Sequence, residues 1–229
     1  MKILLDSADE EIIESYMKIY PLIGVTTNPT ILSKDSKNPV ETLLNIRKII
    51  GHENQLHVQL TETEYDAMMS EAYKIVELLG ENTFVKVPVS EIGIKVMKNL
   101  SKNGVNVTAT AILTATQAML SAEAGAKYVA PYVSRLENIM GNGIETIADI
   151  SQIFSNAGYS TEILAASFKT GKEVLDTALA GAENATVSPA ILKMLSNHPI
   201  SSSSIDGFDK DWKNAFGSSL SSLIDNYKN

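Results

Sequence analysis

The stretch Thr83-Phe84-Val85-Lys86-Val87-Pro88-Val89-Ser90 is the part of the sequence that decides the fold class. Side chains alternate between the two faces of a strand, so Val85 and Val87 share one face and Phe84 and Lys86 share the other. A strand that is apolar on both faces is typical of a parallel sheet covered by helices. The stretch therefore predicts a strand of an α/β protein, with a lysine where an apolar side chain is expected.

Similar β-branched runs recur on both sides of this stretch, and the segments between them have the helical period of about 3.6 residues. Eight strand–helix units within residues 1–200 suit a (β/α)8 TIM barrel, although a doubly wound open sheet has the same alternation. No GxGxxG follows the first strand, which disfavours a dinucleotide-binding sheet. The expected strands are Lys2–Asp6, Ile23–Thr27, Gln55–Leu60, Thr83–Pro88, Val105–Ala111, Tyr128–Val133, Glu162–Ser167 and Ala185–Ser188.

The segment 201–229 differs from the repeating units, and we expect it to form a C-terminal helical arm of the same single domain. Ser201–Ser204 predicts a break, and Ile205–Phe216 predicts a helix with an apolar face. That face carries Phe208, Trp212, Ala215 and Phe216. Two interpretations stay open, a helix that covers its own barrel and an arm that docks on a neighbouring subunit.

The composition excludes several classes of protein. The chain has 229 residues, 44% of them apolar, and its net charge of −8 argues against a nucleic-acid or anionic-membrane binder. It has no cysteine, which excludes disulfides and thiolate chemistry. No apolar run approaches the ~18 residues of a membrane span, and Asp6 comes too early for a signal peptide. We therefore expect a cytoplasmic protein.

Lys86 is the residue with the clearest chemical potential. Burial lowers the pKa of a lysine from about 10.4, and the neutral amine can attack a carbonyl carbon to form an imine. The alternative is a lysine near the end of a strand whose ammonium group reaches solvent. The spacing alone leaves both interpretations open.

Polar residues recur at the carboxyl ends of the expected strands. In a (β/α)8 barrel these ends form the rim on which active sites are assembled. Single members could be helix caps, as Asn28-Pro29 and Ser188-Pro189 suggest, but one polar group at nearly every strand end favours a shared site. The residues are Asp6, Thr26, Thr27, Asn28, Gln59, Thr110, Tyr132 and Ser167.

The chain has only two arginines, and we expect different roles for them. Arg47 lies in the helical stretch Val40–Ile50, where a solvent-exposed position is expected. Arg135 follows Tyr132 by three residues on the rim, where its planar guanidinium suits a phosphate group.

The three histidines show no spacing typical of metal ligands, so no metal is expected. His57 alternates in register with Gln59, which predicts a hydrogen-bonded side chain inside the barrel.

Five motifs together resemble the small transaldolase family, in the branch that includes the fructose-6-phosphate aldolases. They cover essentially the whole chain and are Gly24–Leu32, Phe84–Ser90, Val129–Arg135, Leu164–Lys169 and Asp211–Gly217. The resemblance implies a (β/α)8 barrel, an imine mechanism without a cofactor, sugar phosphates and dihydroxyacetone as ligands, and a homo-oligomeric ring of five or ten subunits.

The resemblance also implies residue roles. Lys86 would form the Schiff base, and Asp6 and Asn28 would contact the lysine or the hydroxyls of the dihydroxyacetone unit. The remaining residues implied in substrate binding are Thr26, Arg135, Ser167 and Lys169, of which the last three would face the phosphate.

Two positions distinguish the branches of this family. Transaldolases resemble one another in a Glu at the place of Gln59 and a Phe at the place of Tyr132, whereas the aldolases resemble this sequence and have Thr110 to hold a catalytic water. An amide does not titrate, so the proton would move through the tyrosine hydroxyl. The expected reaction is cleavage of fructose 6-phosphate into dihydroxyacetone and glyceraldehyde 3-phosphate. The alternatives are a transaldolase of the pentose phosphate pathway and a non-catalytic sugar-phosphate-binding barrel.

Overall fold

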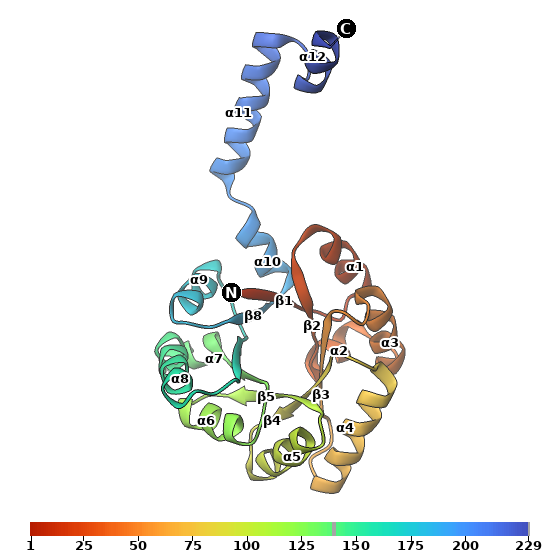
Figure 1. Cartoon of the computed structure of the whole chain (residues 1–229), viewed down its shortest axis with the longest axis vertical. Coiled ribbons are helices and arrows are strands. Elements are labelled where there is room, and N and C mark those ends of the chain that lie inside the picture. The colour runs from red at the N-terminus through yellow and green to blue at the C-terminus, as the bar shows by residue number, and fades with distance from the viewer. Residues whose placement is uncertain (139–140, 229) are drawn as a thin grey trace. The chain divides into compact units, whose positions relative to one another are not determined.

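A computed structural model describes residues 1–138 and 141–228 of the chain (Figure 1). The chain divides into two compact units, Met1–Leu192 and a second unit that begins at Lys193. The expected boundary lay at residue 200, and the assignment of both parts to a single domain stays a prediction. No helix within the described ranges is long and apolar enough to cross a membrane.

The first unit is a closed barrel of parallel strands, which confirms the predicted TIM barrel. Each strand pairs with the next along the chain, and β8 closes the barrel against β1, so the open-sheet alternative is excluded. Figure 1 shows the ring of strands with helices around it. The strands are β1 (Lys2–Asp6), β2 (Leu22–Thr26), β3 (Gln55–Gln59), β4 (Thr83–Pro88), β5 (Asn106–Ile112), β6 (Tyr128–Pro131), β7 (Glu162–Ala165) and β8 (Asn184–Val187).

The ends of the strands differ slightly from those expected, most clearly at β6 and β7, each of which ends two residues early. We expected β6 to continue to Val133, but it ends at Pro131 because Val133 already begins a short helix with Tyr132 as its N-cap. Tyr132 therefore lies after the end of the strand, and the alternation of β6 does not determine the direction of its side chain.

Helices follow the strands and begin at well-defined caps. Asp9, Asn28, Ser90, Thr114 and Thr170 each accept a hydrogen bond from a backbone N–H in the first turn of the helix that they precede. The helices of this unit are α1 (Glu10–Ile19), α2 (Pro29–Asp35), α3 (Pro39–Ile50), α4 (Tyr65–Leu79), α5 (Glu91–Lys102), α6 (Ala115–Glu123), α7 (Val133–Glu137), α8 (Gly143–Ala157), α9 (Gly171–Leu179) and α10 (Pro189–Ser196), which ends in the second unit.

The core has an outer and an inner part. Val85 and Val87 of β4 belong to the outer part, which packs between strands and helices. The inner part is a small cluster in which Phe84 packs with residues from three other strands, namely Leu4, Tyr128 and Leu164. The alternation expected for the central strand is therefore correct, and it leaves Lys86 on the inner face, two residues beyond Phe84.

The second unit contains α11 (Pro199–Phe216) and α12 (Leu220–Tyr227). The expected break at Ser201–Ser204 is wrong, because these residues lie inside α11. Pro199 suits the first turn of a helix, and the Ser204 hydroxyl donates to the carbonyl of Ile200 at 2.8 Å, which satisfies it within the helix. Within the described chain, α11 and α12 have no buried residue, and the side chain of Phe208 is 71% exposed.

Candidate active site

A cavity of about 420 Å³ opens at the carboxyl ends of the barrel strands. It brings together nine of the ten residues predicted for the site; Lys169 is the one that does not line it. The residues that line the cavity are Asp6, Thr26, Asn28, Pro29, Thr30, Gln59, Lys86, Thr110, Ala111, Ala130, Tyr132, Arg135, Leu164, Ala166, Ser167 and Thr186.

Lys86 lines this cavity from β4. Its side chain is only 7% exposed, so the interpretation as a lysine that reaches solvent is excluded. The amine donates a hydrogen bond of 2.7 Å to the backbone carbonyl of Thr27. Burial lowers the pKa of Lys86 from its usual 10.5, and the negative charge of Asp6 opposes this in part. The position therefore favours a neutral amine that is held by the barrel and accessible from the cavity.

Asp6 is held by a chain of two threonine hydroxyls. Thr26 Oγ1 donates to Asp6 Oδ1 at 2.7 Å and lies 2.6 Å from Thr186 Oγ1. When Asp6 is ionised, the single hydroxyl hydrogen of Thr26 is used on the carboxylate, so Thr186 must be the donor to Thr26. Burial raises the pKa of Asp6, while Lys86 and the Thr26 hydroxyl lower it. This carboxyl is thus buried and close enough to Lys86 for their charges to interact.

Sequence reasoning missed Thr186. It belongs to the predicted strand Ala185–Ser188, between two buried apolar residues, and the alternation of that strand already placed it on the opposite face from Ala185 and Val187. The alternation was therefore the signal that could have found this residue.

Gln59 and Thr110 come from β3 and β5, the two strands that flank β4, and both line the cavity with Tyr132. Gln59 pairs with Lys86 in the register of β3 and β4, and the hydroxyls of Thr110 and Tyr132 are 3.3 Å apart. Ala111 has a φ of 59°, and the pairing of β5 with β6 shifts there. This irregularity in β5 is where the strand leaves regular geometry beside Thr110, a common feature next to active sites.

Arg135 and Ser167 lie farther along the rim. The guanidinium carbon of Arg135 is 4.5 Å from the centre of the Tyr132 ring, a cation–π contact that orients the side chain. Ser167 has a φ of 66°, in the left-handed region that is costly for a residue with a Cβ. Lys169 is directed elsewhere, since its side chain is exposed and donates to Asn138 Oδ1 at 3.2 Å.

Asn28 uses its side-chain oxygen to cap α2, where it accepts from the Ile31 N–H at 3.0 Å. Its amide N–H₂ is the group that remains for a ligand in the cavity. The cap therefore fixes which end of the amide a ligand meets, and it explains why one residue serves both a helix start and the rim.

His57 confirms the prediction of a hydrogen-bonded interior residue. Its Nε2 lies 3.0 Å from Gln55 Oε1 and its Nδ1 lies 2.9 Å from the Thr108 hydroxyl. Because an amide oxygen only accepts, Nε2 carries the proton and Nδ1 accepts from Thr108. Burial, and secondly the charge of Lys86, hold the pKa of His57 well below 6.5. The ring is therefore neutral and stacks on Phe84 at 4.5 Å.

The prediction of a solvent-exposed Arg47 is wrong. Its side chain is 5% exposed and donates to the carbonyls of Gly51 and Asn54, both at 2.8 Å. It donates further to the Asn82 carbonyl and the Thr83 hydroxyl, both at 3.3 Å. Arg47 lies in the last turn of α3, and its acceptors belong to the loops that lead into β3 and β4 and to the first residue of β4. The guanidinium therefore lies at the amino end of these strands.

The fold and the cavity define a TIM-barrel protein with a buried lysine that lines a cavity at the carboxyl ends of its strands. A family model described as Transaldolase/Fructose-6-phosphate aldolase matches residues 3–223, and the chain belongs to this family. A protein of Rhizobium meliloti is 39% identical over 93% of this chain and 96% of its own length, and one of Thermodesulfovibrio yellowstonii is 35% identical over 93% and 98%. A protein of Nitrosopumilus maritimus is 36% identical over 93% and 95%. All three are named probable transaldolase.

Proposed function

We propose that the protein is a class I aldolase that cleaves fructose 6-phosphate into dihydroxyacetone and glyceraldehyde 3-phosphate. The observation that carries the proposal is the neighbourhood of Lys86, which has the amide of Gln59 paired beside it and the hydroxyl of Tyr132 in the same cavity. An amide orients water but does not titrate, whereas a phenol both donates and accepts a proton. Together, Gln59 and Tyr132 favour hydrolysis of the intermediate bound to Lys86 over its transfer to a second aldehyde.

In the proposed cycle, the neutral amine of Lys86 adds to C2 of the substrate, and loss of water gives an iminium ion. Removal of the C4 hydroxyl proton breaks the C3–C4 bond, and the electron pair moves into the iminium to give an enamine. Asp6, a buried carboxyl close enough to Lys86 for their charges to interact, is the proposed acceptor of that proton. Glyceraldehyde 3-phosphate is released at this stage.

The second half of the cycle returns the enzyme to its starting state. The enamine takes a proton at C3, and a water that Gln59 and Thr110 orient adds to the iminium. Tyr132, within hydrogen-bond reach of Thr110, moves the proton in both steps. Dihydroxyacetone leaves and the amine is regenerated, so the water lost in the first half is replaced in the second.

The rest of the cavity is assigned to the substrate's polar groups. Asn28 and Thr26 would contact the hydroxyls of the dihydroxyacetone unit. Arg135 and Ser167 would bind the phosphate, for which a planar guanidinium supplies paired donors. The site uses no cofactor in this proposal, because the amine itself supplies the electron sink.

A transaldolase is the second candidate, and the names of the three relatives favour it. A transaldolase keeps the enamine until a second aldehyde arrives, so the two activities differ in their product. The deciding experiment gives the wild-type protein fructose 6-phosphate with and without erythrose 4-phosphate. We expect free dihydroxyacetone as the main product; transfer that is far faster than release overturns the aldolase assignment.

We further propose that the protein works in the cytoplasm as a homo-oligomeric ring to which the second unit contributes. The apolar face predicted for that unit is exposed, with Ile205, Phe208 and Phe216 each more than half exposed. Such a face needs a partner surface in solution. Deletion of residues 205–229 is expected to lower the sedimentation coefficient while the barrel keeps its far-UV spectrum. An unchanged oligomer contradicts this role.

A further inference from the structure

The carboxylate of Glu173 joins two segments of the rim that carry different parts of the cavity. Glu173 Oε2 accepts a hydrogen bond of 2.8 Å from the hydroxyl of Ser134 in α7. The same oxygen accepts from the backbone N–H groups of Lys169 at 2.6 Å and Thr170 at 3.1 Å, in the loop between β7 and α9. One oxygen atom therefore receives three donors from two segments that are distant in the sequence.

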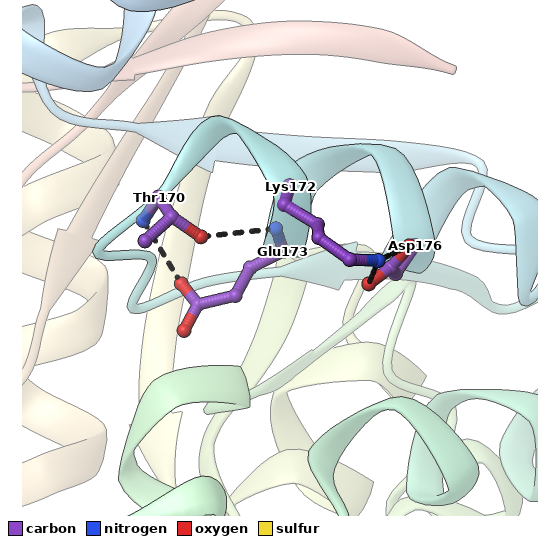
Figure 2. A network of polar contacts seen from close by, with 4 residues as sticks. All are labelled: Thr170, Lys172, Glu173 and Asp176. Atoms are coloured by element: carbon purple, nitrogen blue, oxygen red, sulfur yellow. Dashed lines mark hydrogen bonds and ion pairs between the residues drawn. The ribbon is translucent and has the colours of Figure 1, made fainter.

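Part of this arrangement is a helix cap. Thr170 Oγ1 accepts from the Glu173 N–H at 3.2 Å while Glu173 accepts from the Thr170 N–H, and Figure 2 shows the two side chains facing each other at the first turn of α9. The neighbouring cation, Lys172, is paired with Asp176 at 2.6 Å (Figure 2). The bond from Ser134 goes beyond what a cap requires, because it comes from another helix.

The two joined segments carry the proposed phosphate ligands. Arg135 is the residue after Ser134, and Ser167 lies two residues before Lys169. The Ser134 N–H also donates to the Ser167 carbonyl at 2.8 Å. Ser167 has the left-handed φ of 66°, a conformation that persists only where the surroundings fix it. The bonds to Glu173 are part of those surroundings.

A matched cap in α6 has hydrogen bonds only within its own loop and helix, as far as the described residues show. In α6, Gln117 forms the same reciprocal cap with Thr114, and its Oε1 accepts from the N–H groups of Leu113 and Thr114 at 2.8 and 3.2 Å. Both of these donors belong to its own loop. The difference between Glu173 and Gln117 is therefore the bond to a neighbouring helix.

We propose that Glu173 is a positioning residue, whose carboxylate fixes the distance between Arg135 and Ser167 and thereby sets the affinity for the substrate's phosphate. The proposal rests on the proposed function, which assigns the phosphate to these two residues. A cap without this duty would affect all substrates alike. A residue that positions the phosphate ligands affects only substrates that carry a phosphate.

The test runs the reaction in the direction of synthesis, with dihydroxyacetone as donor and either glyceraldehyde 3-phosphate or glyceraldehyde as acceptor. Glu173→Ala is expected to raise KM for the phosphorylated acceptor by roughly tenfold or more, the size expected for loss of one charge-assisted hydrogen bond. Its kinetics with glyceraldehyde are expected to stay near those of the wild type. Gln117→Ala is the control and should change both acceptors equally.

Two further variants keep the test valid if Glu173→Ala folds poorly. Ser134→Ala leaves the cap of α9 intact and should show the same selective rise in KM. Glu173→Gln keeps an acceptor oxygen and should restore most of the preference for the phosphorylated acceptor. Equal losses with both acceptors in Glu173→Ala and Ser134→Ala overturn the proposal. A wild-type protein that forms no product with either acceptor contradicts the proposed function instead.

Discussion

Lys86 and Arg47 are two buried basic residues at opposite ends of the same barrel, and they show that a basic side chain can be buried for two different reasons. Their exposed fractions are nearly equal, 7% and 5%. Arg47 donates to three backbone carbonyls and one hydroxyl at the amino end of the strands. Lys86 donates to one backbone carbonyl and lines a cavity at the carboxyl end.

The difference lies in the intrinsic basicity of the two groups and in access to the cavity. Burial lowers the pKa of both side chains from their ordinary values. A guanidinium keeps its proton in proteins and serves as a fixed set of donors, whereas an amine can lose its proton and become a nucleophile. Arg47 therefore holds loops together, whereas Lys86 presents to the cavity an amine that is able to lose its proton.

The largest effect is expected at Lys86. Lys86→Met should abolish turnover and leave the fold intact, because methionine fills similar space but forms no imine. With dihydroxyacetone and borohydride, mass mapping of the wild type should find the reduced adduct on Lys86. The trapping rate should rise with pH to a midpoint below 10.5, since burial favours the neutral amine. An adduct on another lysine would contradict the assignment of Lys86 as the nucleophile.

Tyr132 is expected to give the next largest effect. Tyr132→Phe should lower cleavage of fructose 6-phosphate by roughly 10²–10⁴-fold, the usual contribution of a general acid or base. The borohydride adduct should still form, because Lys86 is unchanged. Loss of the adduct would mean that the hydroxyl acts before the imine and not after it.

Adding Gln59→Glu to Tyr132→Phe sharpens the distinction between the two family branches. The double variant regains a titratable group beside Lys86, as the register of β3 and β4 requires. Transfer to erythrose 4-phosphate should increase relative to release of dihydroxyacetone, with both products measured in one reaction. An unchanged product ratio would mean that these two positions do not decide between aldolase and transaldolase.

The sequence predicted the Lys86 end of the barrel far better than the Arg47 end. Alternation within a strand is local, so the positions of Lys86, Gln59 and His57 followed from neighbouring residues. The burial of Arg47 depends on Asn54 and Asn82, which reach it only after two loops have formed. Helical periodicity predicts which face of a helix a residue occupies. It does not predict that a long side chain on that face turns back and becomes buried.

The same limit explains the other differences at the site. The local sequence does not say which way the Lys169 side chain points, and only the folded loop directs it to Asn138. The hydrogen bond from Ser134 to Glu173 joins residues that are 39 positions apart, so no short sequence motif contains both. Contacts between loops are set by the barrel as a whole.

Arg47 should affect stability and not activity. Arg47→Ala is expected to lower the free energy of unfolding by about 2–4 kcal/mol, because several hydrogen bonds to one charged group are lost together. Urea unfolding measures this, and kcat of the folded variant should stay close to that of the wild type. Arg47→Lys should recover only part of the loss, since an ammonium cannot match the guanidinium fork. A variant that is as stable as the wild type but has a low kcat would contradict the purely structural role of Arg47.

His57 should give the smallest effect, and it lies between the two ends. Its pKa in the folded protein is well below the 6.5 of the unfolded chain, so below pH 6.5 the unfolded state binds a proton that the folded state does not. Stability should therefore fall as the pH is lowered, by up to about 1.4 kcal/mol per pH unit from this residue. His57→Asn should flatten the slope between pH 5 and pH 6.5 in urea unfolding; parallel curves would exclude His57 as the cause. Lys86→Met removes the smaller of the two causes of the shift and leaves burial, so the slope should persist there but end at a higher pH.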